Sequence, residues 1–171
     1  MNKKIHFIAG IHGVGKSTYC NKLTKKHEIA HYSASDLIKL WSSAAINDDK
    51  KVIDIDNNQD ILISAINEYV VEDTILLDGH FCLLDMQEIP QKIPKSTFEQ
   101  LNLASVTLIH DDIEAILSRI GSRDSHEHKQ NTFTELQKLE IAYAEELSCS
   151  IGFPLYFKHF SDETSKLENI L

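Results

Sequence analysis

The sequence predicts an α/β fold in which a five-stranded parallel sheet is flanked by helices in three layers. Short apolar runs alternate with segments of helical spacing along the chain, the pattern of strand–helix–strand units. A glycine-rich segment follows the first apolar run and leads into a helix-compatible stretch. The 171 residues, of which 42% are hydrophobic and 25% charged, suit one domain, 1–171, with a single core.

Five short, mostly apolar segments are predicted to be strands, because strands buried on both faces of a parallel sheet read as continuous apolar runs. They are residues 5–9, 28–32, 74–78, 105–109 and 155–157.

Helices are predicted where apolar residues recur at helical spacing and a capping residue precedes them. These segments are 17–26, 36–41 after Ser33 or Ser35, 61–69, 113–120 after Asp111 or Asp112, 132–151 and a terminal helix from Ser161. Thr132 and Glu135 fit a capping box, and Leu167, Ile170 and Leu171 are expected to face the core. Residues 47–59, 122–131 and the stretch between Pro90 and Pro94 are predicted to be loops.

Residues 10–18 read G-I-H-G-V-G-K-S-T and fit the pattern G-x-x-x-x-G-K-[ST], the P-loop. Its glycines let successive backbone amides turn toward phosphate oxygens, and the following helix adds its positive end. Lys16 is predicted to bridge the β- and γ-phosphates of ATP, and the Ser17 hydroxyl to bind Mg²⁺. The expected nucleotide-binding residues are His12, Gly13, Val14, Gly15, Lys16, Ser17 and Thr18.

Asp78 ends the predicted strand 74–78, and a carboxylate at the carboxyl end of a strand beside the P-loop can hold Mg²⁺. We therefore expect Asp78 and Ser17 to form the metal site. Gly79 follows, where many P-loop ATPases place a glutamate that orients water. The pattern favours phosphoryl transfer over hydrolysis, and the absence of N-K-x-D argues against a guanine-reading switch.

The only arginines of the chain, Arg119 and Arg123, lie within one five-residue stretch. A guanidinium fork suits phosphate, so we expect both to act in catalysis with Lys16. They border the polar stretch 122–131, which makes residues 119–131 a predicted short lid that would exclude water during transfer.

The net charge of −9 argues against extended nucleic acid or an anionic membrane as a partner. No apolar run approaches the roughly 20 residues of a membrane span, and no secretory signal precedes the first strand. Three dispersed cysteines, Cys20, Cys82 and Cys149, fit a reducing cytoplasm and an apolar filling role.

Taken together, these motifs resemble a nucleoside monophosphate kinase of the archaeal adenylate kinase type. The segments that carry the resemblance are GIHGVGKST, YSASDLIK, LLDGHF and DIEAILSR with Arg123 and Asp124. The resemblance implies a P-loop kinase fold, with the acceptor nucleotide bound by region 33–71 and the loop after Asp78. It assigns acceptor contacts to Ser35, Asp36, Lys39 and His80. Lys39 stands where the family has arginine, which leaves the identity of the acceptor open.

Two other functions fit the same residues. One is a kinase acting on a nucleoside, a sugar or a shikimate-like alcohol, since these enzymes share the G-x-x-G-x-G-K-S pattern. The other is a switch protein in which ATP orders the lid for a protein partner without turnover.

Overall fold

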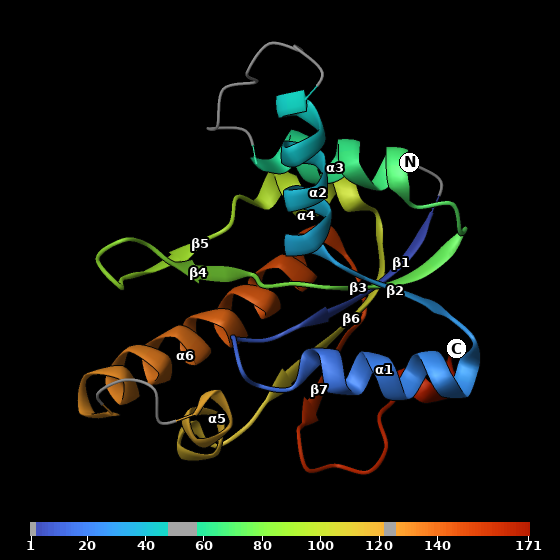
Figure 1. Ribbon diagram of the computed structural model, residues 1–171. Helices are drawn as coiled ribbons and strands as arrows, with labels where there is room; N and C mark the ends of the chain where they lie inside the picture. The colour runs from blue at the N-terminus through green and yellow to red at the C-terminus, as the bar shows by residue number, and fades with distance from the viewer. Residues whose placement is uncertain (1–2, 48–57, 122–125) are drawn as a thin grey trace.

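The computed structural model describes residues 3–47, 58–121 and 126–171, and Figure 1 shows its central parallel sheet. The strands are β1 (Lys4–Ala9), β2 (Ala30–Ser33), β3 (Thr74–Asp78), β6 (Leu103–His110) and β7 (Leu155–His159). They lie in the order β2-β3-β1-β6-β7, and every neighbouring pair is parallel. The predicted five-stranded parallel sheet is confirmed, with each predicted strand in place to within two residues at either end.

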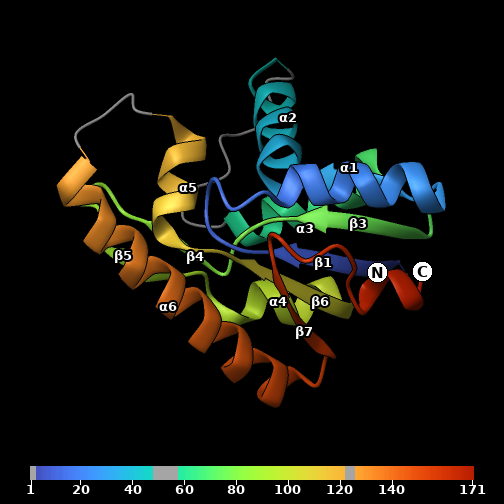
Figure 2. The ribbon, with the colours of Figure 1, turned by 90° about the horizontal axis from the view of Figure 1, so that it is seen from below.

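Helices cover both faces of the sheet, which gives the three layers that the sequence predicts. They are α1 (Lys16–His27), α2 (Ala34–Asn47), α3 (Asn58–Tyr69), α4 (Lys95–Leu101), α5 (Ile113–Ile120) and α6 (His126–Ile151). Helix α1 packs on β1, β2 and β3, whereas α6 packs on β6, β7 and a small hairpin. Figure 2 shows α1 along one side of the sheet and α6 along the other. No helix in the described part of the chain is long and apolar enough to cross a membrane.

A two-stranded antiparallel hairpin, β4 (Cys82–Leu84) and β5 (Pro90–Lys92), extends from the end of β3. The prediction of a loop between Pro90 and Pro94 is therefore wrong for residues 90–92. Pro90 is tolerated because it is the first residue of its strand, where the missing N–H interrupts little of the ladder. The Asp85 carboxylate shapes the turn by accepting hydrogen bonds from the amides of Gln87 and Ile89. The hairpin lies beside α6 and positions one wall of the site below.

Helix α6 begins at His126, so residues 126–131 are helical and the capping box at Thr132 is wrong. Within the helix, Thr134 donates a hydrogen bond from its hydroxyl to the carbonyl oxygen of Gln130 at 2.7 Å. The predicted lid 119–131 thus comprises the end of α5, the start of α6 and residues 122–125, which lie outside the described residues. Most of the loop predicted at 47–59 also lies outside them.

The predicted terminal helix from Ser161 is reduced to a single 3₁₀ turn at Leu167–Asn169. Leu167 is buried, but Ile170 is half exposed and does not face the core as expected. The segment is held instead through charge and hydroxyl contacts to α1. Lys26 donates to Glu168 at 2.7 Å, and Tyr19 hydrogen-bonds Ser165. Contacts to a distant helix therefore replace a local helix, and a local pattern cannot foresee them.

Aromatic side chains fill the core beneath the carboxyl end of β1 and β3. The ring of Phe81 lies 5.3 Å from that of Phe7 and 4.7 Å from that of Phe98, and all three are buried. Phe153 stacks on Phe81 from the end of α6. This cluster fixes the loop after β3, which carries Gly79 and His80.

Candidate active site

The P-loop connects β1 to α1 and packs closely against β6 and the residue that follows β7. Gly10 has φ +140° and Gly15 has φ +106°, conformations in which a side chain would be strained. A Cβ at Gly10 would lie 2.5 Å from the carbonyl oxygen of Ile109, and one at Gly15 would overlap the ring of Phe160. The loop therefore approaches β6 and the end of β7 so closely that only glycine fits at either position.

Lys16 is buried at the first turn of α1, and its ammonium group points into the loop. The Nζ atom donates hydrogen bonds to the carbonyl oxygens of Gly10 at 2.7 Å and Ile11 at 3.1 Å. Burial lowers its pKa to about 8, and the nearby Asp78 and Glu140 carboxylates oppose that shift. Ser17 is exposed beside it, as are His12 and Thr18. Lys16 therefore lies at a helix N-terminus, where anions bind favourably, and its contact with phosphate oxygens stays a prediction.

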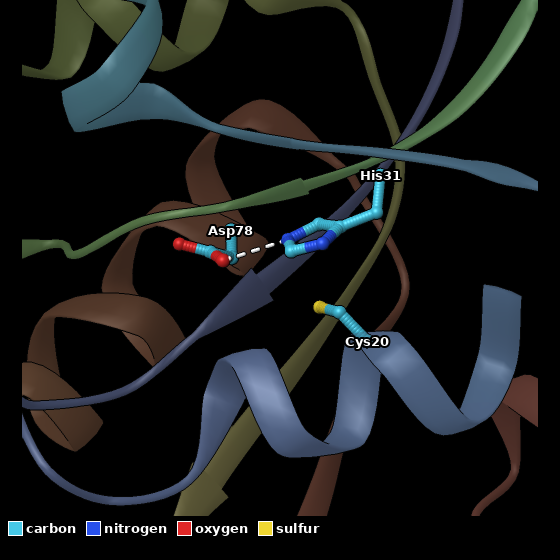
Figure 3. Close-up of side chains that lie close together, drawn as sticks. All are labelled: Cys20, His31 and Asp78. Atoms are coloured by element: carbon cyan, nitrogen blue, oxygen red, sulfur yellow. Dashed lines mark hydrogen bonds and ion pairs between the residues drawn. The ribbon is translucent and has the colours of Figure 1, made fainter.

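Asp78 lies at the carboxyl end of β3, next to the strand that feeds the P-loop. One of its carboxylate oxygens, Oδ2, is 2.7 Å from Nε2 of His31 on β2, and Figure 3 shows the second oxygen turned away from His31. His31 thus fixes the orientation of the carboxylate while leaving an oxygen for another partner. Carboxylate and hydroxyl oxygens are the donors that Mg²⁺ prefers, so Asp78 and Ser17 fit a magnesium site.

Cys20 completes a small group with His31 and Asp78, because its Sγ, a ring nitrogen of His31 and a carboxylate oxygen of Asp78 all lie within 4.8 Å of one another (Figure 3). Burial strongly raises the pKa of the Cys20 thiol, and the Asp78 charge adds to this shift. A neutral thiol packs as a small apolar group. Cys20 and Cys82 are both buried and without disulfides, which agrees with the filling role expected for them. Cys149 is exposed, so the filling role expected for it is wrong.

His80 joins the P-loop to the loop after β3. Its Nε2 atom lies 3.0 Å from Nζ of Lys16. Burial and the Lys16 charge lower the pKa of His80 to about 3, so its ring is neutral at ordinary pH. Nε2 therefore acts as the acceptor of a hydrogen bond that Lys16 donates.

A cavity of about 370 Å³ begins at Asp78 and His80 and extends between α2, α4 and the hairpin. Its wall is largely apolar and carries a few polar groups, a typical composition for a small-molecule site. The polar lining residues are Ser33, Ser35, Asp78, His80, Gln91, Lys92 and Thr97. The apolar part is formed mainly by Phe7, Ile38, Leu62, Ile93, Phe98 and Leu101.

The structure brings together only some of the residues expected around an acceptor. Ser35 and His80 line the cavity. Asp36 and Lys39 do not: their side chains are each 76% exposed on α2, where they pair with each other at 3.6 Å. Asp36 lies in the first turn of that helix, where a negative charge is favourable. Contacts from Asp36 and Lys39 to an acceptor stay a prediction.

Arg119 lies at the other side of the P-loop, at the end of α5. Its Nε donates to the carbonyl oxygen of Gly13 at 3.1 Å, and its Nη2 donates to Asp111 Oδ2 at 2.6 Å. The guanidinium also lies 4.3 Å from the centre of the Phe160 ring. Burial would raise the pKa of Asp111, but the Arg119 hydrogen bond and charge hold it below the usual value. Arg123 lies outside the described residues.

Sequence reasoning missed three groups at this site: His31, Lys92 and Glu140. His31 reaches Asp78 across adjacent strands that are 47 residues apart, which no local pattern reveals. Lys92 enters through the hairpin that was not predicted. Glu140 had a visible signal, because it falls on the predicted buried face of α6 between Leu136 and Tyr143, where a charge is unusual.

Comparison with known proteins supports a nucleotide-binding chain. The family described as "AAA domain" matches residues 9–137, three quarters of the sequence. No curated protein matches. Among solved structures, an unliganded sugar kinase from Janibacter sp. HTCC2649 superposes with a TM-score of 0.53 and 13% identity, covering 94% of this chain and 87% of that one. At this identity the similarity shows the fold alone.

Proposed function

Because this chain belongs to the AAA domain family, we propose that it transfers the γ-phosphoryl group of ATP to a small acceptor, with a nucleoside monophosphate as the first acceptor class. The hydrogen bond between Lys16 and His80 carries the proposal, because Lys16 belongs to the phosphate loop and His80 lines the adjoining cavity. A phosphate donor and an acceptor would therefore meet at this contact.

In this proposal an acceptor oxygen attacks the γ-phosphorus of ATP. The bond between the γ-phosphorus and the β,γ-bridging oxygen breaks, and its electron pair leaves with ADP. Lys16 and the backbone amides of residues 12–18 hold the phosphates. Asp78, oriented by His31, and Ser17 would hold Mg²⁺, which neutralises charge on the transferring group when it is bound. Arg123 would add positive charge from the α5 side, and Arg119 would do so if it exchanges its ion pair with Asp111 for one with the phosphates.

The adenylate kinase-like motifs favour a monophosphate acceptor, yet one observation favours an uncharged one. Among described residues, Lys92 is the only lysine or arginine that lines the cavity, and it is already 2.6 Å from Glu146. An apolar wall with a single neutralised cation suits a nucleoside, a sugar or another alcohol. The fold similarity to a sugar kinase is compatible with this second candidate.

An ADP-release assay with ATP and Mg²⁺ separates these functions. Stimulation by a nucleoside monophosphate, with phosphorylated product identified by mass spectrometry, supports the first candidate, whereas stimulation by a nucleoside or sugar supports the second. Arg123→Ala should then lower mainly kcat, because a charge that acts on the transition state contributes little to ground-state binding. Binding of ATP with no stimulation by any acceptor would leave the switch function and contradict a kinase.

A further inference from the structure

The Glu140 carboxylate, at the middle of α6, is fully buried and faces three backbone amides. Oε1 accepts hydrogen bonds from the N–H groups of Gly10 at 3.2 Å and Phe81 at 2.9 Å. Oε2 accepts from Phe81 at 3.0 Å and Cys82 at 2.6 Å. A single side chain therefore binds two segments that are about 70 residues apart in sequence.

The proposed reaction requires these two segments to keep a fixed position relative to each other. Gly10 is the first residue of the P-loop after β1, and Phe81 follows His80 at the edge of the cavity. The ladder between β1 and β3 ends just before this point, with Gly79 donating to the carbonyl oxygen of Ile8 at 3.1 Å. Beyond it, Glu140 takes over the pairing of amides that the sheet no longer pairs.

Burying a carboxylate costs desolvation free energy, so stability alone does not explain this arrangement. Burial raises the pKa of Glu140 to about 7, while the amide hydrogen bonds and the Lys16 charge favour its ionised form. A well-packed apolar residue often serves stability as well as a buried charge does. A carboxylate that instead binds the start of the P-loop and the end of the loop after β3 indicates a task in positioning.

We propose that Glu140 is a positioning residue that couples the P-loop to the acceptor loop at residues 79–82, so that nucleotide binding at one orders the other. This inference rests on the proposed function for its kinetic consequence. The coupling itself concerns two segments of this chain and can be measured without any acceptor.

Glu140→Gln tests the coupling, because the amide keeps the volume but replaces one acceptor oxygen with a donor that faces a backbone N–H. The probe is ATP with Mg²⁺, and the readout is amide hydrogen exchange. In the wild type, ATP should slow exchange at residues 81–84 as well as in the P-loop. In the variant, protection of the P-loop should persist, and protection of 81–84 should be lost. Equal protection of 81–84 in both proteins would overturn the proposal.

Glu135→Gln is the matched control, since Glu135 lies on the same helix and is exposed. It should behave as the wild type. If Glu140→Gln does not fold, Glu140→Asp, which keeps both oxygens on a shorter arm, replaces it with the same expected loss. The wild-type measurement also stands alone: ATP that protects the P-loop but leaves residues 81–84 unchanged contradicts the coupling.

Kinetics add a second readout once an acceptor is known. A displacement of about 1 Å between reacting groups can cost on the order of 100-fold in rate. Glu140→Gln should therefore lower kcat by roughly 10- to 100-fold while the affinity for ATP changes by less than about threefold. A fall in both by the same factor would mark Glu140 as purely structural. Failure to find any acceptor would contradict the proposed kinase and leave the exchange result intact.

Discussion

Nε2 of His80 accepts a hydrogen bond from the ammonium of Lys16, so the neutral imidazole of the loop after β3 touches the lysine of the P-loop. His80→Ala removes this contact and one polar group of the cavity wall. We expect KM for the acceptor to rise on the order of 10-fold, the value of one hydrogen bond, while ATP affinity changes less than about threefold. Steady-state kinetics with isothermal titration of ATP would measure both. Loss of ATP affinity without a change in acceptor KM would contradict the placement of His80 in the cavity.

Lys16→Ala should weaken ATP binding on the order of 10- to 100-fold, because charge-assisted hydrogen bonds to phosphate are lost. Calorimetric titration with ATP and Mg²⁺ gives the affinity directly. Lys25→Ala is the control, since Lys25 is an exposed lysine in the last turn of the same helix. An unchanged affinity in Lys16→Ala would remove the basis of every function considered above.

Two glycines with similar positive φ angles allow steric clamping of the P-loop to be separated from backbone strain. Gly15 has φ +106° and Gly152 has φ +94°. A Cβ at Gly15 would overlap Phe160, whereas a Cβ at Gly152 meets nothing within 4 Å. Gly152→Ala should cost about 1 kcal/mol from strain alone. Gly15→Ala should cost roughly 2 to 4 kcal/mol and reduce ATP binding. Urea unfolding would measure the difference, and equal losses would contradict the clamp.

The sequence predicted the parts of this protein whose information is local. The P-loop, the strand that ends at Asp78 and the apolar periodicity of α6 each lie within a few residues, and all are present. The hairpin strand at 90–92 was missed because a three-residue strand containing proline carries no periodic signal. The start of α6 was misplaced because a polar first turn resembles a loop when packing partners are unknown.

Contacts between distant segments account for what the sequence left out of the site. His31 orients Asp78 from a neighbouring strand, and Glu140 reaches Gly10 across 130 residues. Conversely, Lys39 was expected at the acceptor from its place in a motif, yet its side chain lies exposed on α2 beside Asp36. A motif gives residue order, whereas the helix rotation that decides which side chains enter the cavity depends on packing with the rest of the chain.

His6 makes the stability of the protein depend on pH below neutrality. It lies on β1 with 2% of its surface exposed, and its Nδ1 is 2.7 Å from the hydroxyl of Ser105. Its Nε2 is buried with no hydrogen-bond partner among the described residues. Burial, with a smaller effect of the Lys4 charge, lowers the pKa of His6 to about 4 from 6.5. Between these pH values the unfolded chain therefore binds the proton and the folded protein does not.

Stability attributable to His6 is thus fully present above pH 6.5 and is lost as pH falls toward 4. The loss should reach about 2 kcal/mol at pH 5 and about 3 kcal/mol at pH 4. His6→Asn keeps a polar atom near Ser105 and removes the titrating ring. Its free energy of unfolding in urea should lie below that of the wild type at pH 7.5, and the gap should shrink or reverse by pH 5. Carboxylates titrate equally in both proteins, so a gap that stays constant from pH 7.5 to 5 would show that His6 does not control this dependence.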